Sequence, residues 1–254
     1  GVACVILLDT LDSTVREPDQ VHRLFGTELI GPLPLVRDSR TIQAAAATAA
    51  SRQELIHLSS NNGQPSTEDA RSFTAFEEAI RMVRNSILLA DFDRRLRSIL
   101  FTSATPGEGK STAALHLAIA HADQGKRTLL IDADLRRPTL HRKLGLEADP
   151  GLTEVLNGDC SWSSAVIQVP ASPNLSFLGA GTPSRRAADL VGSGVADILD
   201  AASRQYDLVI LDAPPLLGFA EPMQLAIAVD GVVVVAVAGE TNRKAIRAVV
   251  STLQ

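Results

Sequence analysis

Short apolar runs alternate with amphipathic segments along most of the chain from about residue 73. The runs rich in Val, Ile and Leu are 98–102, 128–131, 175–178, 208–211 and 232–237. Apolar residues at helical spacing occupy 73–89, 111–124, 187–203 and 242–253. Strands that alternate with helices and are apolar along nearly their whole length are typical of a mostly parallel sheet with helices on both faces. We therefore predict an α/β fold whose ligands bind at the carboxyl ends of the strands.

The two ends of the chain follow a different pattern. The apolar run at residues 2–8 is shorter than the roughly 20 residues that cross a bilayer, so on its own it favours a buried element. Residues 16–34 predict a small module with a helix between Pro18 and Gly26. Segment 37–72, rich in Ala, Ser, Gln and Asn, has linker composition. Because a last helix normally leads into another strand, we expect the sheet to continue beyond residue 254.

Composition and charge exclude several classes of protein. Of the 254 residues, 45% are hydrophobic and 21% charged, which is enough to build a large core. The net charge of −5 argues against a nucleic-acid binder, because such proteins neutralise phosphates with Lys and Arg. Two cysteines, Cys4 and Cys160, cannot form a disulfide framework or a Cys-x-x-Cys iron–sulfur site. A reducing, cytoplasmic setting fits this usage. The chain has a single tyrosine, Tyr206.

A candidate phosphate-binding loop follows the first predicted strand and precedes a helix, as a P-loop requires. Gly107 and Gly109 allow successive backbone N–H groups to point at a phosphate, and the helix N-terminus favours the same anion. Lys110 would reach the β- and γ-phosphates, and the Ser111 hydroxyl would bind Mg²⁺. Ala104 stands where the pattern has Gly. The predicted nucleotide-binding residues here are Thr105, Pro106, Gly107, Glu108, Gly109, Lys110, Ser111 and Thr112.

Aspartates end two other predicted strands. Asp132 and Asp134 follow run 128–131, and Asp212 follows run 208–211. Carboxylates at this edge can hold Mg²⁺ directly or through water, and one of them can accept a proton. With Ser111, these three aspartates form the predicted metal site, and with Lys110 they predict binding of Mg²⁺ and ATP.

These motifs together resemble the bacterial tyrosine kinases, the cytoplasmic autokinase domains of capsular and exopolysaccharide co-polymerases. Residues 103–112 are similar to the family's Walker A motif and 212–215 to its Walker B motif. Asp132, Asp134 and Arg136 match the distinctive Walker A′ motif. The resemblance implies a P-loop kinase that uses ATP and Mg²⁺, with Lys110, Asp132 and Asp134 as catalytic residues. It also places Arg136 at the nucleotide, and Asp132 is our candidate for the base that takes the tyrosine proton.

The resemblance also implies an assembly at the cytoplasmic face of the bacterial inner (plasma) membrane. Glu78, Arg81 and Arg84 share one helix face and are similar to the family's Glu-x-x-Arg-x-x-Arg helix, which supports a ring-shaped homo-oligomer. On the spacing alone, a solvated, salt-bridged face is the better interpretation. The implied partners are a membrane co-polymerase portion of the same or another chain and a phosphotyrosine phosphatase. The implied divisions of the chain are the end of a truncated membrane helix (1–12), a juxtamembrane segment (13–36), a linker (37–72) and a kinase domain (73–254) truncated at its C-terminus.

Three departures from the family pattern keep alternatives open. Arg186 and Ala187 stand where the family often has Asn-Pro, and Glu221 stands where it usually has Asp. The family's tyrosine-rich C-terminal tail is not in this chain, and we expect Tyr206 to be a packing residue. A scaffold that binds ATP without catalysis is therefore one alternative. Another is a partition- or septum-type ATPase, although such proteins carry Lys where this chain has Thr105.

Overall fold

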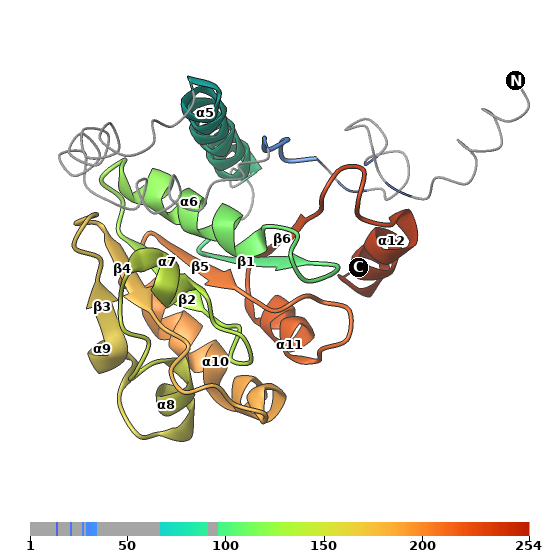
Figure 1. Cartoon of the computed structure of the whole chain (residues 1–254). Helices are drawn as coiled ribbons and strands as arrows, with labels where there is room; N and C mark the ends of the chain where they lie inside the picture. The colour runs from blue at the N-terminus through green and yellow to red at the C-terminus, as the bar shows by residue number, and fades with distance from the viewer. Residues whose placement is uncertain are drawn as a thin grey trace, which may run out of the picture.

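The computed structural model describes residues 14, 21, 27, 29–34, 67–90 and 96–253, and within them six strands form one sheet with helices on both sides (Figure 1). The strands are β1 (Ser98–Ser103), β2 (Thr128–Asp132), β3 (Val166–Gln168), β4 (Leu175–Leu178), β5 (Leu208–Asp212) and β6 (Gly231–Val235). The helices are α5 (Thr67–Ala90), α6 (Lys110–Ala122), α7 (Leu140–Leu144), α8 (Leu152–Asn157), α9 (Trp162–Ala165), α10 (Ala187–Ser203), α11 (Glu221–Ala228) and α12 (Arg243–Leu253).

The sheet has the order β3-β4-β2-β5-β1-β6, and every neighbouring pair is parallel except β3 with β4. All five predicted strands are confirmed, with ends shifted by no more than the usual one or two residues. The antiparallel edge strand β3 was not predicted, because three residues are too few to show a periodicity. Parallel pairing aligns the carboxyl ends of the central strands, and Asp132 lies directly opposite Asp212.

The apolar runs are nearly continuous because both faces of the sheet are buried. In β5, Val209 and Leu211 belong to the core beneath α10, whereas Leu208 and Ile210 belong to the core beneath α6. Side chains alternate between the two faces of a strand, so a strand covered on both sides needs apolar residues at every position. Figure 1 shows α6 on one side of the sheet, with α5 outside it, and α10 on the other side.

Helix α5 begins at Thr67, six residues before its predicted start and inside the segment predicted to be a linker. It packs on α6, with Val83 and Ile87 in the core that α6 covers. Ile30 and Leu33 pack against the same core. The predicted membrane-helix end at 1–12 and most of segment 13–66 lie outside the described residues. No helix in the described part of the chain combines the length and apolar character needed to cross a bilayer.

Candidate nucleotide-binding site

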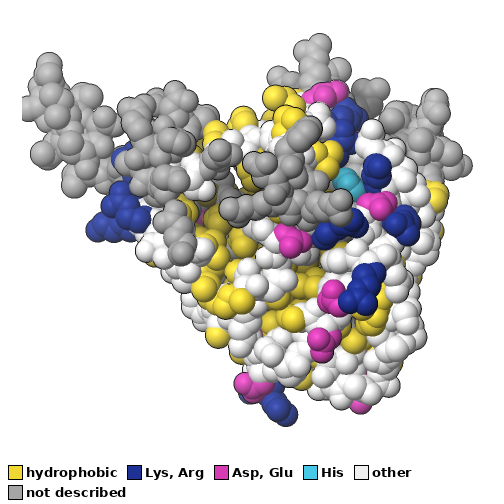
Figure 2. Space-filling model, turned by 180° about the vertical axis from the view of Figure 1, so that it is seen from behind, with side chains coloured by type: hydrophobic (Ala, Val, Ile, Leu, Met, Phe, Trp, Pro, Cys, Tyr) yellow, Lys and Arg dark blue, Asp and Glu magenta, His cyan; other side chains and the backbone are white. Residues whose placement is uncertain are grey.

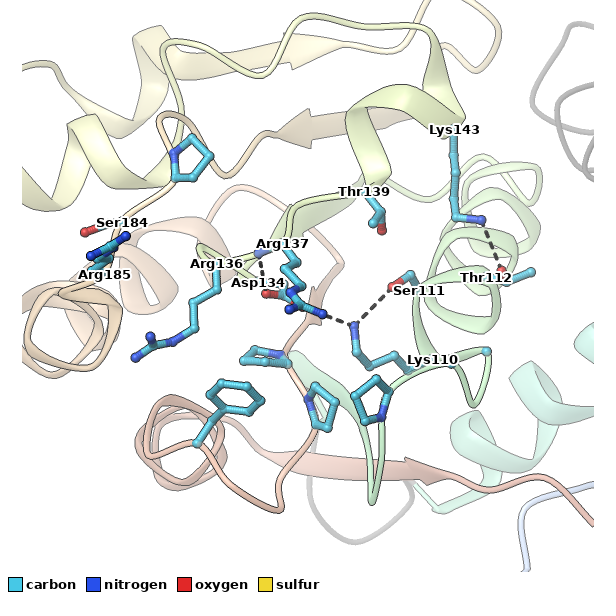
Figure 3. Close-up of a pocket in the computed structure, with 17 residues that line it drawn as sticks. Lys110, Ser111, Thr112, Asp134, Arg136, Arg137, Thr139, Lys143, Ser184 and Arg185 are labelled. Carbon is cyan, nitrogen blue, oxygen red and sulfur yellow. Dashed lines mark hydrogen bonds and ion pairs between the residues drawn. The ribbon is translucent and has the colours of Figure 1, made fainter. Parts of the chain in front are cut away.

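A cavity of about 760 Å³ opens at the carboxyl edge of the sheet, and Figure 3 shows its lining side chains. This volume lies within the range of small-molecule sites. The lining residues come from the loops after β1, β2, β4 and β5: Pro106, Gly107, Gly109, Lys110, Ser111, Thr112, Asp134, Arg136, Arg137, Thr139, Lys143, Pro183, Ser184, Arg185, Pro214, Pro215 and Phe219.

The predicted P-loop forms one wall of this pocket. Strand β1 ends at Ser103, and α6 begins at Lys110. Gly107 and Gly109 have φ angles of 89° and 87°, a conformation that other residues rarely adopt, so these turns depend on glycine. Ala104, at the position where the pattern has glycine, is fully buried against Leu216 and Val249, so the larger residue is accommodated in the core.

Two residues of the predicted loop do not line the pocket. The buried Glu108 accepts a hydrogen bond from the Thr105 N–H at 2.8 Å and another from the Thr241 hydroxyl, in the turn before α12. Glu108 therefore braces the loop from behind. No local sequence pattern could have revealed this role, because Thr241 lies far along the chain.

Lys110 lies between carboxylates from two strands. Its Nζ is 3.3 Å from Asp212 Oδ1, 3.6 Å from Asp134 Oδ2 and 3.2 Å from the Ser111 hydroxyl. The structure thus brings together the lysine, the hydroxyl and two of the three predicted carboxylates. A cation held in this way needs little reorganisation before it meets a phosphate.

Asp132 is adjacent to this group but does not line the pocket. Its carboxylate is fully buried and accepts hydrogen bonds from the N–H groups of Asp134, Thr139 and Leu140 at 3.0–3.3 Å. Burial raises the pKa of Asp132 to about 7, and the negative charge of Asp212 adds to the shift. A carboxylate with this pKa is suited to proton transfer near neutral pH. The Asp132 side chain is therefore closed off from the pocket in this structure.

Asp212 is also fully buried, and burial raises its pKa to about 6 despite the opposing attraction of Lys110. Its Oδ2 atom has no hydrogen-bond partner among the described residues. A buried carboxylate oxygen without a partner is costly unless a cation completes its environment. The Ser111 hydroxyl lies close to the same carboxylate.

These features fit a divalent cation that shares its ligands with a phosphate. No cluster of three His, Cys, Asp or Glu side chains within the described residues could hold a metal by itself. Mg²⁺ commonly retains several waters and binds through one or two carboxylates together with substrate phosphates. Asp212, Asp134 and Ser111 are therefore the residues that would hold it.

Several residues of the pocket were missed by sequence reasoning. Lys143, on α7, donates a hydrogen bond to the Thr112 hydroxyl at 3.3 Å, and burial, together with the charge of Lys110, lowers its pKa. Arg136, which was predicted at the nucleotide, lines the pocket, and its Nε binds the buried carboxylate of Glu221 at 2.5 Å. Its guanidinium also lies over the Phe219 ring, 5.4 Å from the centroid. The sequence signal that could have indicated a basic pocket is the pair of arginines, Arg136 and Arg137, soon after Asp134.

The three residues predicted for oligomerisation lie on α5, away from the pocket. Glu78 and Arg81 are exposed and form an ion pair at 2.6 Å. Arg84 instead faces α6, where its Nη1 donates to the Ala120 carbonyl at 3.0 Å. Arg84 is half-buried and thus helps to hold α5 on α6, whereas Glu78 and Arg81 are the exposed members of the three.

Fold and site together define a P-loop nucleotide-binding domain, a class that binds a nucleotide with a divalent metal. Residues 96–254 match the protein family described as AAA domain (AAA_31). Tyrosine-protein kinase YwqD of Bacillus subtilis (strain 168) is 42% identical over 168 residues, which cover 66% of this chain and 70% of YwqD. Succinoglycan biosynthesis transport protein ExoP of Rhizobium meliloti (strain 1021) is 27% identical over 266 residues, covering 97% of this chain.

The chain spans 33% of ExoP, so it corresponds to one part of that protein. The solved structure of the BceF tyrosine kinase domain is 28% identical, superposes with a TM-score of 0.75 and covers 94% of this chain and 93% of its own. The chain belongs to the bacterial tyrosine kinase family, which confirms the resemblance found in its motifs.

Proposed function

We propose that this chain transfers the γ-phosphoryl group of Mg²⁺-bound ATP to tyrosine side chains and thereby regulates capsular or exopolysaccharide assembly. The observation that carries the proposal is the position of Lys110 Nζ, which lies 3.3 Å from Asp212 and 3.6 Å from Asp134 beside the P-loop. The similar proteins support the choice of tyrosine as acceptor and of polysaccharide assembly as the process, because YwqD is named a tyrosine-protein kinase and ExoP a succinoglycan biosynthesis transport protein.

The residues of the P-loop bind and orient the triphosphate. Backbone N–H groups of residues 107–112 cradle the phosphates, and Lys110 places its charge where negative charge develops on the β–γ bridging oxygen. Bound Mg²⁺ would neutralise further phosphate charge, held by Ser111, Asp212 and Asp134. The tyrosine oxygen attacks the γ-phosphorus, the bond to the bridging oxygen breaks, and ADP leaves.

A carboxylate takes the tyrosine proton in this scheme. Asp132 is our candidate because its pKa of about 7 suits a base near neutral pH. Asp134 is the aspartate that lines the pocket. Comparing the pH dependence of kcat for Asp132→Asn and Asp134→Asn distinguishes them, since only loss of the base removes the limb of the profile near pH 7.

The acceptor tyrosine must come from outside the described fold. Tyr206 is half-buried, packs against the core beneath α10 and immediately precedes Asp207 and β5, at the sheet edge opposite the pocket. We therefore propose that the acceptor tyrosine belongs to a polypeptide segment other than residues 1–254. We propose separately that the chain forms a homo-oligomer to which Glu78 and Arg81 contribute. A ring at the cytoplasmic face of the inner membrane, a co-polymerase portion and an opposing phosphatase belong to the same proposal. So do the divisions at 1–12 and 13–36, and a linker from residue 37 that ends where α5 begins, at Thr67 rather than at residue 73.

Incubation of the purified chain with Mg²⁺, ATP and a synthetic tyrosine peptide, followed by phosphotyrosine detection, tests this function. We expect phosphorylation by the wild type and at least about a 100-fold loss in Lys110→Met. Lys126→Met is the matched control, because Lys126 is exposed in the turn before β2 at the opposite edge. Nucleotide binding without phosphotransfer would support the scaffold alternative. Hydrolysis of ATP that depends on Thr105, without phosphotyrosine, would support the partition-type ATPase.

A further inference from the structure

The pocket extends well beyond the phosphate-binding loop. Figure 3 shows Lys110, Ser111, Thr112 and Lys143 toward one end, and Arg136, Ser184 and Arg185 toward the other. The second end is built from the loops after β2 and β4, which are farther from β1 in the sheet order. The cavity therefore has room for a group other than the triphosphate.

The lining of this pocket is strongly basic. Five of its residues are Lys or Arg and only one is acidic: Lys110, Arg136, Arg137, Lys143 and Arg185, with Asp134. This excess occurs in a chain whose net charge is −5. On the face seen in Figure 2, by contrast, acidic and basic side chains lie next to one another. The local excess indicates that the pocket binds more negative charge than its own residues supply.

The arginines at the far end differ in how they are held. Glu221 and Phe219 fix the orientation of Arg136, as an ion pair and a stacked ring do in preorganised anion sites. The exposed side chains of Arg137 and Arg185 form no ion pair with any described residue. Arg186, the next residue, lies outside the pocket and pairs with Asp189 at 3.7 Å. Arg185 and Arg186 are adjacent in the sequence but have different environments: of these two, Arg185 lines the cavity and Arg186 does not.

The direction of phosphoryl transfer indicates what the arginine end of the pocket, lined by Arg136 and Arg185, would bind. Attacking and leaving oxygens lie roughly in line, so the acceptor must approach the γ-phosphate from the side opposite the β-phosphate. The P-loop and Lys110 occupy one end of the cavity, which leaves the arginine end for the acceptor. We propose that Arg185, with Arg136 and Arg137, forms a subsite that binds an acidic acceptor peptide, one with carboxylates next to its tyrosine. This inference rests on the proposed kinase function.

Three peptides of equal length, with Glu, Gln or Lys on both sides of a single tyrosine, test the subsite. We expect the wild type to phosphorylate the Glu peptide with a kcat/KM about 10-fold above that of the Lys peptide, because opposite charges attract and like charges repel across a binding surface. The difference should shrink when salt is raised from about 0.05 to 0.5 M. Arg185→Ala should lower kcat/KM for the Glu peptide about 3-fold, in line with the modest energy of an exposed pair.

Charge reversal provides the decisive variant. Arg185→Glu should make the Lys peptide the better substrate, a gain that misfolding could not produce. Arg186→Glu makes the same change in net charge outside the pocket, so it should keep the wild-type order of preference. Equal use of the three peptides by the wild type would overturn the proposal. The same holds if Arg186→Glu alters the preference as much as Arg185→Glu does, or if Arg185→Glu weakens ATP binding but not peptide discrimination.

Binding separates failure of the subsite from failure of the kinase function. Fluorescein-labelled versions of the three peptides are titrated with protein that holds a non-hydrolysable ATP analogue and Mg²⁺, and anisotropy is recorded. If no peptide is phosphorylated but the Glu peptide binds selectively and Arg185→Glu abolishes that selectivity, the subsite stands and the kinase function fails. If phosphotyrosine forms without charge preference in either assay, the kinase function stands and the subsite fails.

Discussion

Aspartates at the amino ends of the strands are hydrogen-bonded, whereas those at the carboxyl ends are buried and have raised pKa values. Strand β5 has one aspartate of each kind. Asp207, just before β5, accepts hydrogen bonds from the Arg127 N–H at 2.9 Å and from its guanidinium at 3.1 Å. The pair with Arg127 lowers the pKa of Asp207. Asp212, at the other end, is buried with one unpartnered oxygen, and its pKa rises to about 6.

The same contrast holds for neighbouring strands. Asp230, before β6, accepts three hydrogen bonds at 2.8–2.9 Å, from the N–H groups of Arg97 and Ser98 and from the Ser98 hydroxyl. Burial raises the pKa of Asp132, at the carboxyl end of β2, to about 7, and the negative charge of Asp212 adds to the shift. The aspartates at the amino ends of the strands are hydrogen-bonded and have a structural role, whereas those at the carboxyl ends are fully buried with raised pKa values, and Asp212 Oδ2 has no hydrogen-bond partner among the described residues. Perturbed carboxylates of this kind concentrate at functional sites.

Asparagine at the two ends of β5 gives the largest expected difference. Asp212→Asn should lower kcat for phosphotransfer about 100-fold, because it removes a charge next to Lys110 that the proposed mechanism uses to hold Mg²⁺. Asp207→Asn should leave kcat within about 2-fold, since its partner Arg127 lies at the opposite edge. Steady-state kinetics on both proteins makes the comparison, and a similar loss in both would mean that β5 tolerates no change at either end.

The next effect is on stability as a function of pH, measured without metal or nucleotide. The folded protein binds the Asp132 proton more tightly than the unfolded chain does, so this contribution is present below pH 4 and is lost as pH rises toward 7. A shift of this size corresponds to at most about 4 kcal/mol in the free energy of unfolding. Urea denaturation at pH 5 and pH 8 should show the loss in the wild type.

Asp132→Asn should reduce that pH dependence, because its side chain does not titrate, while Asp212, whose pKa is also raised, keeps its own contribution. Asp207→Asn is again the control and should retain the wild-type slope between pH 5 and 8, since the pKa of Asp207 lies below this window. A wild-type protein that becomes more stable between pH 5 and 8 would contradict the assigned crowding of Asp132 and Asp212.

A smaller effect is expected from Asp230→Ala, which leaves three donors without their acceptor. Ser98 is buried, so the cost in the free energy of unfolding should be about 2 kcal/mol, while kcat stays within about 2-fold. Thermal or urea denaturation measures the loss. Asp230→Asn keeps one acceptor oxygen and should lower the free energy of unfolding by less. An Asp230 variant that is stable but inactive would contradict the assignment of a purely structural role to aspartates at the amino ends of the strands.

The smallest effect belongs to the ion pair between Arg127 and Asp207, whose side chains are 62% and 37% exposed. Solvent screens such pairs, so Arg127→Ala should cost about 0.5 kcal/mol at neutral pH. The contribution is present above pH 4 and is lost as pH falls through the lowered pKa of Asp207. Unfolding in low and high salt should show the difference shrink with salt.

Local patterns were sufficient for most of the fold and for part of the site. Five of the six strands found among the described residues, and the long helices, follow from apolar periodicity, since each depends on interactions between residues close in sequence. The convergence of Lys110, Asp134 and Asp212 follows from the rule that parallel strands align their carboxyl ends. The three-residue strand β3 has no periodicity, and its pairing depends on β4 alone.

Contacts between distant segments decided the remainder. The Glu108 bond to Thr241, the Glu221 bond to Arg136 and the entry of Lys143 and Arg185 into the pocket join loops with no shared local pattern. The environment of a side chain also depends on distant segments. Asp132 and Asp134 have similar sequence contexts, yet Asp132 is fully buried and Asp134 lines the pocket. Periodicity and motifs place residues at an edge, but burial and charge depend on which other segments fold against them.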